Sequence, residues 1–272
     1  HMWIQFALLV VSAFLMMELN NSNALIRIYS RMVSCSFIVL AVMAYFLFVD
    51  IKCGIVQTCF IAFYLFLFTT YQSRASVGRV FYAFAMLGIA SIYYVQILFF
   101  IPVIWVLMAT NIMNGCARVY VASLLGLLLP YWFATGYYAF TDQISLIGDH
   151  FTALLDFDSQ SVWLDIPLVQ IVTIVFIALL AVVGMINFRL NNYRDKIRTR
   201  MLFDFFSVMI IFTMIFMILQ PTNMHFLLAM LIVSASPLIG HFISLTNSLI
   251  TNLIFCFMLV ATLALTVCNV WI

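Results

Sequence analysis

The chain has 272 residues, of which 67% are hydrophobic and only 7% are charged. A soluble domain is about half apolar and about a quarter charged, so lipid must be the solvent for much of this chain. The net charge of +2 comes from few, segregated charges, and the lack of a basic face outside one loop argues against nucleic-acid binding. We therefore expect an all-α polytopic transmembrane bundle that forms a single domain over residues 1–272.

Apolar stretches alternate with short polar breaks and predict about ten helical segments. Four consecutive polar residues, 20–23, are expected to end the first segment, and Pro237 and Gly240 are expected to kink or interrupt the ninth. The expected segments are roughly 3–17, 32–49, 55–71, two short helices within 80–111, 119–140, 166–188, 201–219, 224–244 and 249–272.

The apolar stretch 80–110 is too long for one span and short for two. A single helix of this length would measure about 45 Å, whereas the hydrocarbon core of a bilayer is roughly 30 Å thick. Tyr93, Tyr94 and Gln96 lie in its middle, and Pro102 follows. We expect a hairpin of two short helices at about 80–111, with these three polar side chains at its corner.

The charges predict which side of the membrane each loop faces. The loop 189–200 holds five of the eleven Lys and Arg residues and is expected to be cytoplasmic, whereas the loop 141–165 holds five Asp residues and is expected to be external. With a hairpin at 80–111, four further arginines also face the cytoplasm: Arg27, Arg31, Arg74 and Arg79. With one long helix instead, all four would face outward, so the positive-inside rule favours the hairpin. Both chain ends fall outside, which suggests that the native protein has a further helix before the first.

The acidic loop 141–165 is the best candidate for a catalytic or metal-binding site. Asp149 with His150, and Asp156 with Asp158, could bind a divalent cation or act as acid and base. We expect a short amphipathic helix at about 146–155 and a recess between this loop and the hairpin corner. The alternative is an ordinary solvated loop, since the spacing matches no known metal motif.

The basic loop 189–200 could bind the phosphates of membrane lipids through Arg194, Lys196, Arg198 and Arg200. Topology signalling alone would explain the same cluster equally well. Asp204 follows the loop, and we expect it to form an ion pair with Arg198 or Arg200.

The histidines and cysteines favour structural roles. His225 and His241 are too far apart on one helix to share a ligand, and only four histidines occur, so we expect no haem or iron site. A divalent cation is expected only if the chain is an enzyme, and no other cofactor is indicated. The six cysteines contain no CxxC pair and are expected to be free thiols.

The residues 87–94, 99–102, 124–131, 192–200 and 220–223 resemble a family of polytopic inner-membrane proteins of Bacteroidota that has no assigned activity. The resemblance implies a bacterial inner membrane and one more N-terminal helix. The region from Gly88 to Pro102 is also similar to the membrane core of C-type-fold glycosyltransferases. Those enzymes carry a catalytic acidic residue in the first external loop, which this chain lacks, so the second likeness implies architecture more than activity.

Three functional hypotheses follow. The first is an inner-membrane scaffold or lipid-binding component of cell-envelope assembly, with membrane lipids and another membrane protein as partners. The second is a glycosyltransferase-like enzyme that uses a polyprenyl-linked donor and external aspartates. The third is a small-molecule transporter, which is disfavoured because no acidic residue lies in the middle of a span.

Overall fold

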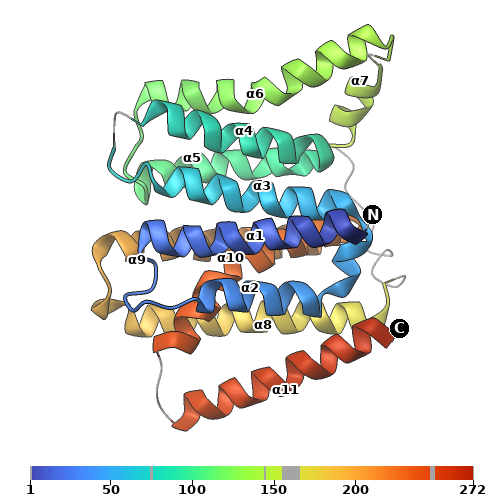
Figure 1. Cartoon of the computed structure of the whole chain (residues 1–272). Coiled ribbons are helices and arrows are strands. Elements are labelled where there is room, and N and C mark those ends of the chain that lie inside the picture. Colours follow the sequence, from blue (N-terminus) through green and yellow to red (C-terminus); the bar gives the residue numbers. More distant parts are fainter. Residues whose placement is uncertain (1, 74–75, 144, 155–165, 246–248, 272) are drawn as a thin grey trace.

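The chain runs back and forth between two ends of a helical bundle (Figure 1). The computed structural model describes residues 2–73, 76–143, 145–154, 166–245 and 249–271, and within these ranges it contains eleven α-helices and no strand. The helices are α1 (Met2–Asn23), α2 (Met32–Met43), α3 (Ile51–Phe68), α4 (Val77–Tyr93), α5 (Ile101–Thr110), α6 (Ala117–Phe140), α7 (Ser145–Thr152), α8 (Leu168–Asn191), α9 (Ile197–Leu219), α10 (Met224–Leu245) and α11 (Leu249–Trp271). Short 3-10 segments join some of them: η1 (Tyr45–Val49), η2 (Val95–Phe100), η4 (Asn192–Arg194) and η5 (Pro221–Asn223).

Seven helices in the described ranges are long and apolar enough to cross a membrane: α1, α3, α6, α8, α9, α10 and α11. The shorter apolar helices are α2, α4 and the η2–α5 segment. The prediction of an all-α membrane bundle is confirmed at this level. The number of segments that cross the bilayer stays a prediction.

Helix α10 is the core of the bundle, because 89% of the residues in an apolar 18-residue stretch within 221–245 are buried inside the protein. Its serines bond to neighbouring helices: the Tyr64 hydroxyl lies 2.8 Å from Ser234 Oγ, and Ser36 Oγ donates to the Ser236 carbonyl at 2.9 Å. A Cβ on Gly240 would lie 2.9 Å from the backbone nitrogen of Val33, so only glycine permits this approach of α2. The helix continues through Pro237, where an interruption or kink is predicted.

The hairpin predicted at 80–111 is present. Helix α4 ends at Tyr93, Tyr94 adopts an extended conformation, and η2 and α5 lead the chain back (Figure 1). The two ends of this segment meet, since Gln72 N donates to the Ile112 carbonyl at 3.0 Å and Asn114 Nδ2 donates to Ser76 Oγ at 3.2 Å. The segment therefore folds back on itself, so that its two ends lie side by side.

Helices α4 and α6 pack backbone against backbone. A Cβ on Gly126 would collide with the carbonyl oxygen of Phe81, and a Cβ on Gly88 would lie 2.7 Å from the carbonyl oxygen of Leu127. Small residues commonly permit this close approach of membrane helices. It fixes α6, and with it the start of α7, against the hairpin.

The two ends of the bundle differ in charge. Nine of the ten Lys and Arg residues in the described ranges belong to one end, which we call the basic end: Arg27, Arg31, Arg79, Arg118, Arg189, Arg194, Lys196, Arg198 and Arg200. The other end, the acidic end, carries Asp50, Asp142 and Asp149 together with Lys52. Helix α1 begins and α11 ends at the acidic end (Figure 1).

Two predicted boundaries are wrong. The first helix is predicted to end near residue 17, but it includes the polar residues 20–23: Asn23 Nδ2 donates to the Leu19 carbonyl at 3.1 Å, and Asn20 Nδ2 donates to the Ser30 carbonyl at 2.9 Å. Helix α1 ends only at Asn23, and Ala24 follows with a φ of 48°. The basic loop is also shorter than 189–200, since α8 continues to Asn191 and α9 begins at Ile197.

Candidate functional site

A cavity opens at the acidic end between α4, α6 and α7, where a recess beside the hairpin is predicted. It measures about 320 Å³, and its lining combines apolar and polar side chains. The lining residues are Ile92 from α4; Tyr131, Ala134, Thr135 and Tyr138 from α6; and Leu146, Ile147 and His150 from α7. The predicted short helix at 146–155 corresponds to α7, which covers Ser145–Thr152.

Aromatic contacts hold α7 against α6. The Tyr131 ring lies 5.4 Å from the Phe151 ring and 6.0 Å from the His150 imidazole, measured between ring centroids. The corner also contributes, because Gln96 Nε2 donates to the Ala153 carbonyl at 3.1 Å. These contacts connect the hairpin corner to the acidic loop 141–165, which is predicted to lie beside it.

Two polar atoms beside this cavity, Tyr131 Oη and His150 Nε2, are buried, and both residues interact with Ser91 of α4. Their polar neighbour is Ser91, whose hydroxyl donates to the Gly88 carbonyl at 2.9 Å. Burial lowers the pKa of His150, and the Ser91 backbone partly offsets this. The imidazole is therefore neutral at neutral pH, and it offers one donor and one acceptor.

The predicted acidic residues do not converge on this cavity as far as the structure describes them. Asp149 is exposed to solvent, and Asp156 and Asp158 lie outside the described residues. Over the described ranges, no three His, Cys, Asp or Glu side chains are grouped as a metal would require. A metal site on this loop stays a prediction that rests on the aspartates of 156–158.

The three predicted corner residues have different fates. Tyr93 is 41% exposed, whereas Tyr94 and Gln96 are buried. The Tyr94 hydroxyl donates to Gln220 Oε1 at 3.4 Å, and its ring stacks on Phe226 at 5.1 Å. Tyr94 thus contacts the α9–α10 turn, and among the described contacts Gln96 reaches the acidic loop.

A buried hydrogen bond between a histidine and an aspartate lies at the basic end. His241 Nε2 and Asp195 Oδ2 are 3.0 Å apart, and both side chains are no more than 3% exposed. Arg27 Nε approaches the other carboxylate oxygen at 3.8 Å. The Phe188 and Phe203 rings meet the imidazole edge-on at 5.2 Å and 5.1 Å. This cluster ties the α8–α9 loop to the core helix α10.

The predicted phosphate-binding residues are not equivalent. Arg198 is used inside the protein: its Nη2 donates to Asn23 Oδ1 at 2.8 Å and to the Phe68 carbonyl at 3.3 Å, and its guanidinium lies over the Tyr71 ring. Lys196 is exposed, Arg200 is half-buried, and the backbone of Arg194 forms part of η4. Lipid binding by the cluster stays a prediction, with Lys196 the most accessible of the charges whose exposure is described.

The ion pair predicted for Asp204 is wrong in its partner. Asp204 Oδ1 lies 3.3 Å from Arg189 Nη2, at the end of α8. Arg198 points away toward Asn23 and Phe68, so it cannot also reach Asp204. Adjacent helices α8 and α9 provide a closer partner than the residues of the same helix do.

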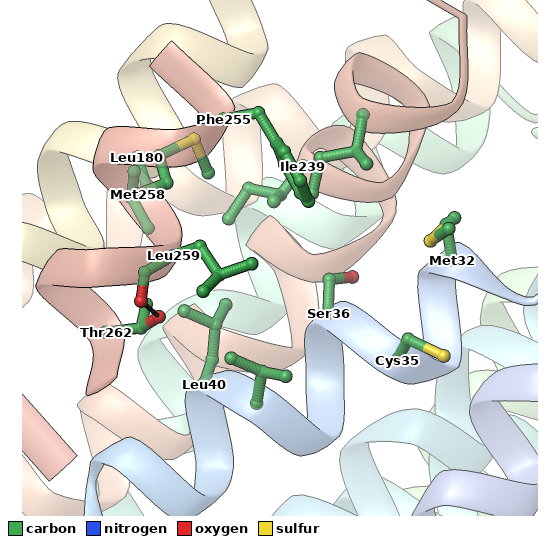
Figure 2. A pocket seen from close by; sticks show the side chains of 12 residues that line it. Met32, Cys35, Ser36, Leu40, Leu180, Ile239, Phe255, Met258, Leu259 and Thr262 are labelled. Carbon is green, nitrogen blue, oxygen red and sulfur yellow. Dashed lines mark hydrogen bonds between the residues drawn. The ribbon is translucent and has the colours of Figure 1, made fainter. Parts of the chain in front are cut away.

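An apolar groove of about 220 Å³ separates α11 from the rest of the bundle (Figure 2). Leu40 of α2 and Leu259 of α11 belong to its opposite walls, and α8 and α10 complete it. Its lining residues are Met32, Cys35, Ser36, Val39, Leu40, Leu180, Ile239, Ile243, Phe255, Met258, Leu259 and Thr262. No sequence pattern predicts this groove, because it depends on how closely α11 packs against its neighbours.

Helix α11 is attached to the bundle mainly at the acidic end. Asn269 Nδ2 donates to the Met43 carbonyl at 3.0 Å and to Thr173 Oγ1 at 2.9 Å. Toward its other end α11 diverges from α8 (Figure 1). Only 6% of the residues in an apolar 18-residue stretch within 251–269 are buried. The groove lies in the part of this interface that begins near Met32, at the basic end.

No protein-family model, no curated protein and no solved structure matches this chain. The likeness to the Bacteroidota inner-membrane family and to the C-type glycosyltransferases therefore stays an expectation.

Proposed function

We propose that this chain is a lipid-binding inner-membrane protein, in which the groove between α2 and α11 holds an acyl chain of an anionic phospholipid. The groove is the observation that carries this proposal. It lies between a tightly packed core and a helix that is bound mainly at one end. A hydrocarbon chain fills such a space with apolar contacts on every side.

The polar groups of the groove favour a hydrocarbon occupant because they already have partners. Ser36 Oγ donates to the Ser236 carbonyl at 2.9 Å. Thr262 Oγ1 donates to the Leu259 carbonyl within its own helix, also at 2.9 Å. Neither hydroxyl therefore needs a ligand, and a polar ligand would lose hydration without gaining these bonds.

The charge distribution favours an anionic headgroup at the basic end. Arg31 directly precedes Met32, which lines the groove, and Arg31 is exposed. Clusters of Lys and Arg beside membrane helices attract anionic lipids, at about 1 kcal/mol for each residue near the surface. The positive charge also favours one orientation of the protein in the membrane, with the basic end toward the cytoplasm and the acidic end outside.

Native mass spectrometry on protein reloaded from mixed phosphatidylglycerol and phosphatidylethanolamine vesicles tests the proposal. We expect one retained phosphatidylglycerol for each chain. Leu259→Trp fills the groove and should abolish retention. The matched control, Val260→Trp, places the same side chain at a position that is 65% exposed and does not line the groove.

The headgroup preference has its own pair of variants. Arg31→Gln should reduce the preference for phosphatidylglycerol, whereas Lys52→Gln, at the acidic end, should leave it unchanged. Equal retention by both tryptophan variants would show that lipid does not occupy the groove. Equal retention of the two lipids by the unmodified protein would contradict the anionic headgroup.

A further inference from the structure

Helix α11 forms one wall of the groove, and its two ends are held to the bundle in different ways. At the basic end the chain itself ties α11, because α10 ends at Leu245 and α11 begins at Leu249. Four residues of chain reach at most about 14 Å, so this end of α11 cannot move far from α10. At the acidic end the tie is the side chain of Asn269.

Asn269 bonds to two helices at once. Its Nδ2 donates to the carbonyl of Met43, where α2 ends, at 3.0 Å and to Thr173 Oγ1 of α8 at 2.9 Å. Thr173 Oγ1 donates its own hydrogen to the Val169 carbonyl at 2.8 Å, so its oxygen can accept from Asn269. One amide group thus joins α11 to both α2 and α8, which line the groove with it.

Apolar contacts oppose the separation of α11 less than these bonds do. Met258 and Leu265 pack against the bundle, but few residues of α11 are buried. Lipid tails are as apolar as these side chains, so lipid can replace such contacts at little cost. Hydrocarbon offers no hydrogen-bond partner to an amide, so the bonds of Asn269 resist separation at the acidic end.

We propose that α11 is a gate between the groove and the bilayer, and that Asn269 holds this gate closed. The inference rests on the proposed function, because it concerns access to the same groove. Leu259 lies midway between Leu249 and Asn269, opposite Leu40 of α2 (Figure 2). When Asn269 releases its partners, α11 pivots about its basic end, and the groove widens at Leu259 by about half the distance that Asn269 moves.

The bonds of Asn269 are weak enough to open without unfolding the protein. Hydrogen bonds between membrane helices each change an equilibrium by about three- to twentyfold. Two such bonds keep the open form a minor state that is still populated. An acyl chain can then enter or leave the groove sideways, without passing through water.

Spin-label distances in nanodiscs test the movement in a background without the native cysteines. Labels that replace Val172 and Val267 report on the acidic ends of α8 and α11, and labels that replace Ile186 and Leu253 report on the basic ends. All four native side chains are more than 40% exposed, so the labels do not disturb the packing. Asn269→Leu should lengthen or broaden the first distance. The second should change about a quarter as much, because it lies close to the pivot.

Lipid release tests the consequence for the groove. Protein loaded with deuterated phosphatidylglycerol is mixed with an excess of unlabelled vesicles, and native mass spectrometry follows the exchange. Asn269→Leu should speed release about tenfold, and Thr173→Val, which removes one of the two acceptors, should have a smaller effect. Thr266→Val is the matched control and should leave release unchanged, because the Thr266 hydroxyl donates to the Thr262 carbonyl within α11 itself, at 2.7 Å.

Unchanged distances and unchanged release in a folded Asn269→Leu protein would overturn the gate. Equal changes of distance at both ends would contradict the pivot, and faster release from Thr266→Val would show that Asn269 has no special role. A parent protein that retains no lipid would contradict the proposed function instead, and the spin-label distances would still decide whether Asn269 holds α11 closed. Thermal unfolding verifies that each variant is folded.

Discussion

The imidazole of His241 and the carboxylate of Asp195 lie 3.0 Å apart inside the protein, although 46 residues separate them in the chain. This contact joins the α8–α9 loop to the most buried helix of the bundle. Arg27, which follows α1, reaches the same carboxylate. Three segments that are distant in sequence are thus fixed at one point of the basic end.

Asp195→Ala should destabilise the protein by about 1–3 kcal/mol, because it leaves the buried His241 without its partner. Asp204→Ala is the control, since its partner Arg189 is 62% exposed and such a pair contributes at most about 1 kcal/mol. Thermal unfolding in one detergent compares the two. Equal midpoints would mean that the buried pair contributes no more than the exposed pair.

Gly126→Ala should destabilise the bundle by about 1–3 kcal/mol, because the added Cβ would collide with the carbonyl oxygen of Phe81. Gly136→Ala on the same helix meets no atom within 4 Å and should be neutral or stabilising by up to about 1 kcal/mol. Denaturation of the two variants alongside the parent measures the difference. A stable Gly126→Ala protein would show that α4 and α6 can separate without cost.

His150 should make stability depend on pH in one direction. Burial lowers its pKa in the folded protein below the ordinary value of 6.5, so the unfolded chain takes up a proton first as the pH falls. Its contribution is therefore fully present above about pH 6.5 and decreases as the pH falls through that value toward the folded pKa. The unfolding midpoint of the parent should fall further between pH 7 and pH 5 than that of His150→Gln.

The His150 comparison isolates one residue, because His225 and His241 titrate in both proteins. Parallel pH profiles would contradict a lowered pKa. An NMR titration of His150 provides a direct reading, and we expect a midpoint below 6.5.

Cysteine labelling should place the two ends of the bundle on opposite sides of the membrane. In a background without the native cysteines, a cysteine at 118 should be protected from an impermeant reagent in intact cells. A cysteine at 149 or 223 should react. Labelling at 118 together with protection at 223 would reverse the proposed orientation.

The hairpin could be predicted from sequence because two simple quantities disagree there, the length of the apolar stretch and the thickness of a bilayer. The charged ends were predictable for a similar reason, since Lys and Arg gather in alternate loops. Neither argument requires knowledge of which helices are neighbours. Each depends only on the order of residues along the chain.

The pairing of His241 with Asp195 could not be predicted in this way. It depends on which face of α10 meets the α8–α9 loop, and α10 is apolar on nearly every side. The end of α1 was predicted too early for a related reason: a run of polar residues indicates that a helix has ended before it, but these Asn side chains bond within the fold and the helix includes them. The groove and the Tyr131–His150 cavity likewise depend on how closely helices pack.

Helices α10 and α11 have similar lengths and compositions, but the protein buries most of α10 and very little of α11. Protein surrounds α10, so an acceptable substitution there must keep volume and hydrogen bonds, and even a histidine can be accommodated if it finds a partner. Little of α11 is buried in the protein, and on a helix that faces lipid an apolar residue of almost any shape would serve and an added charge would not. Selection should therefore preserve the shape of α10 and only the hydrophobicity of α11, apart from the residues that face the groove and Asn269.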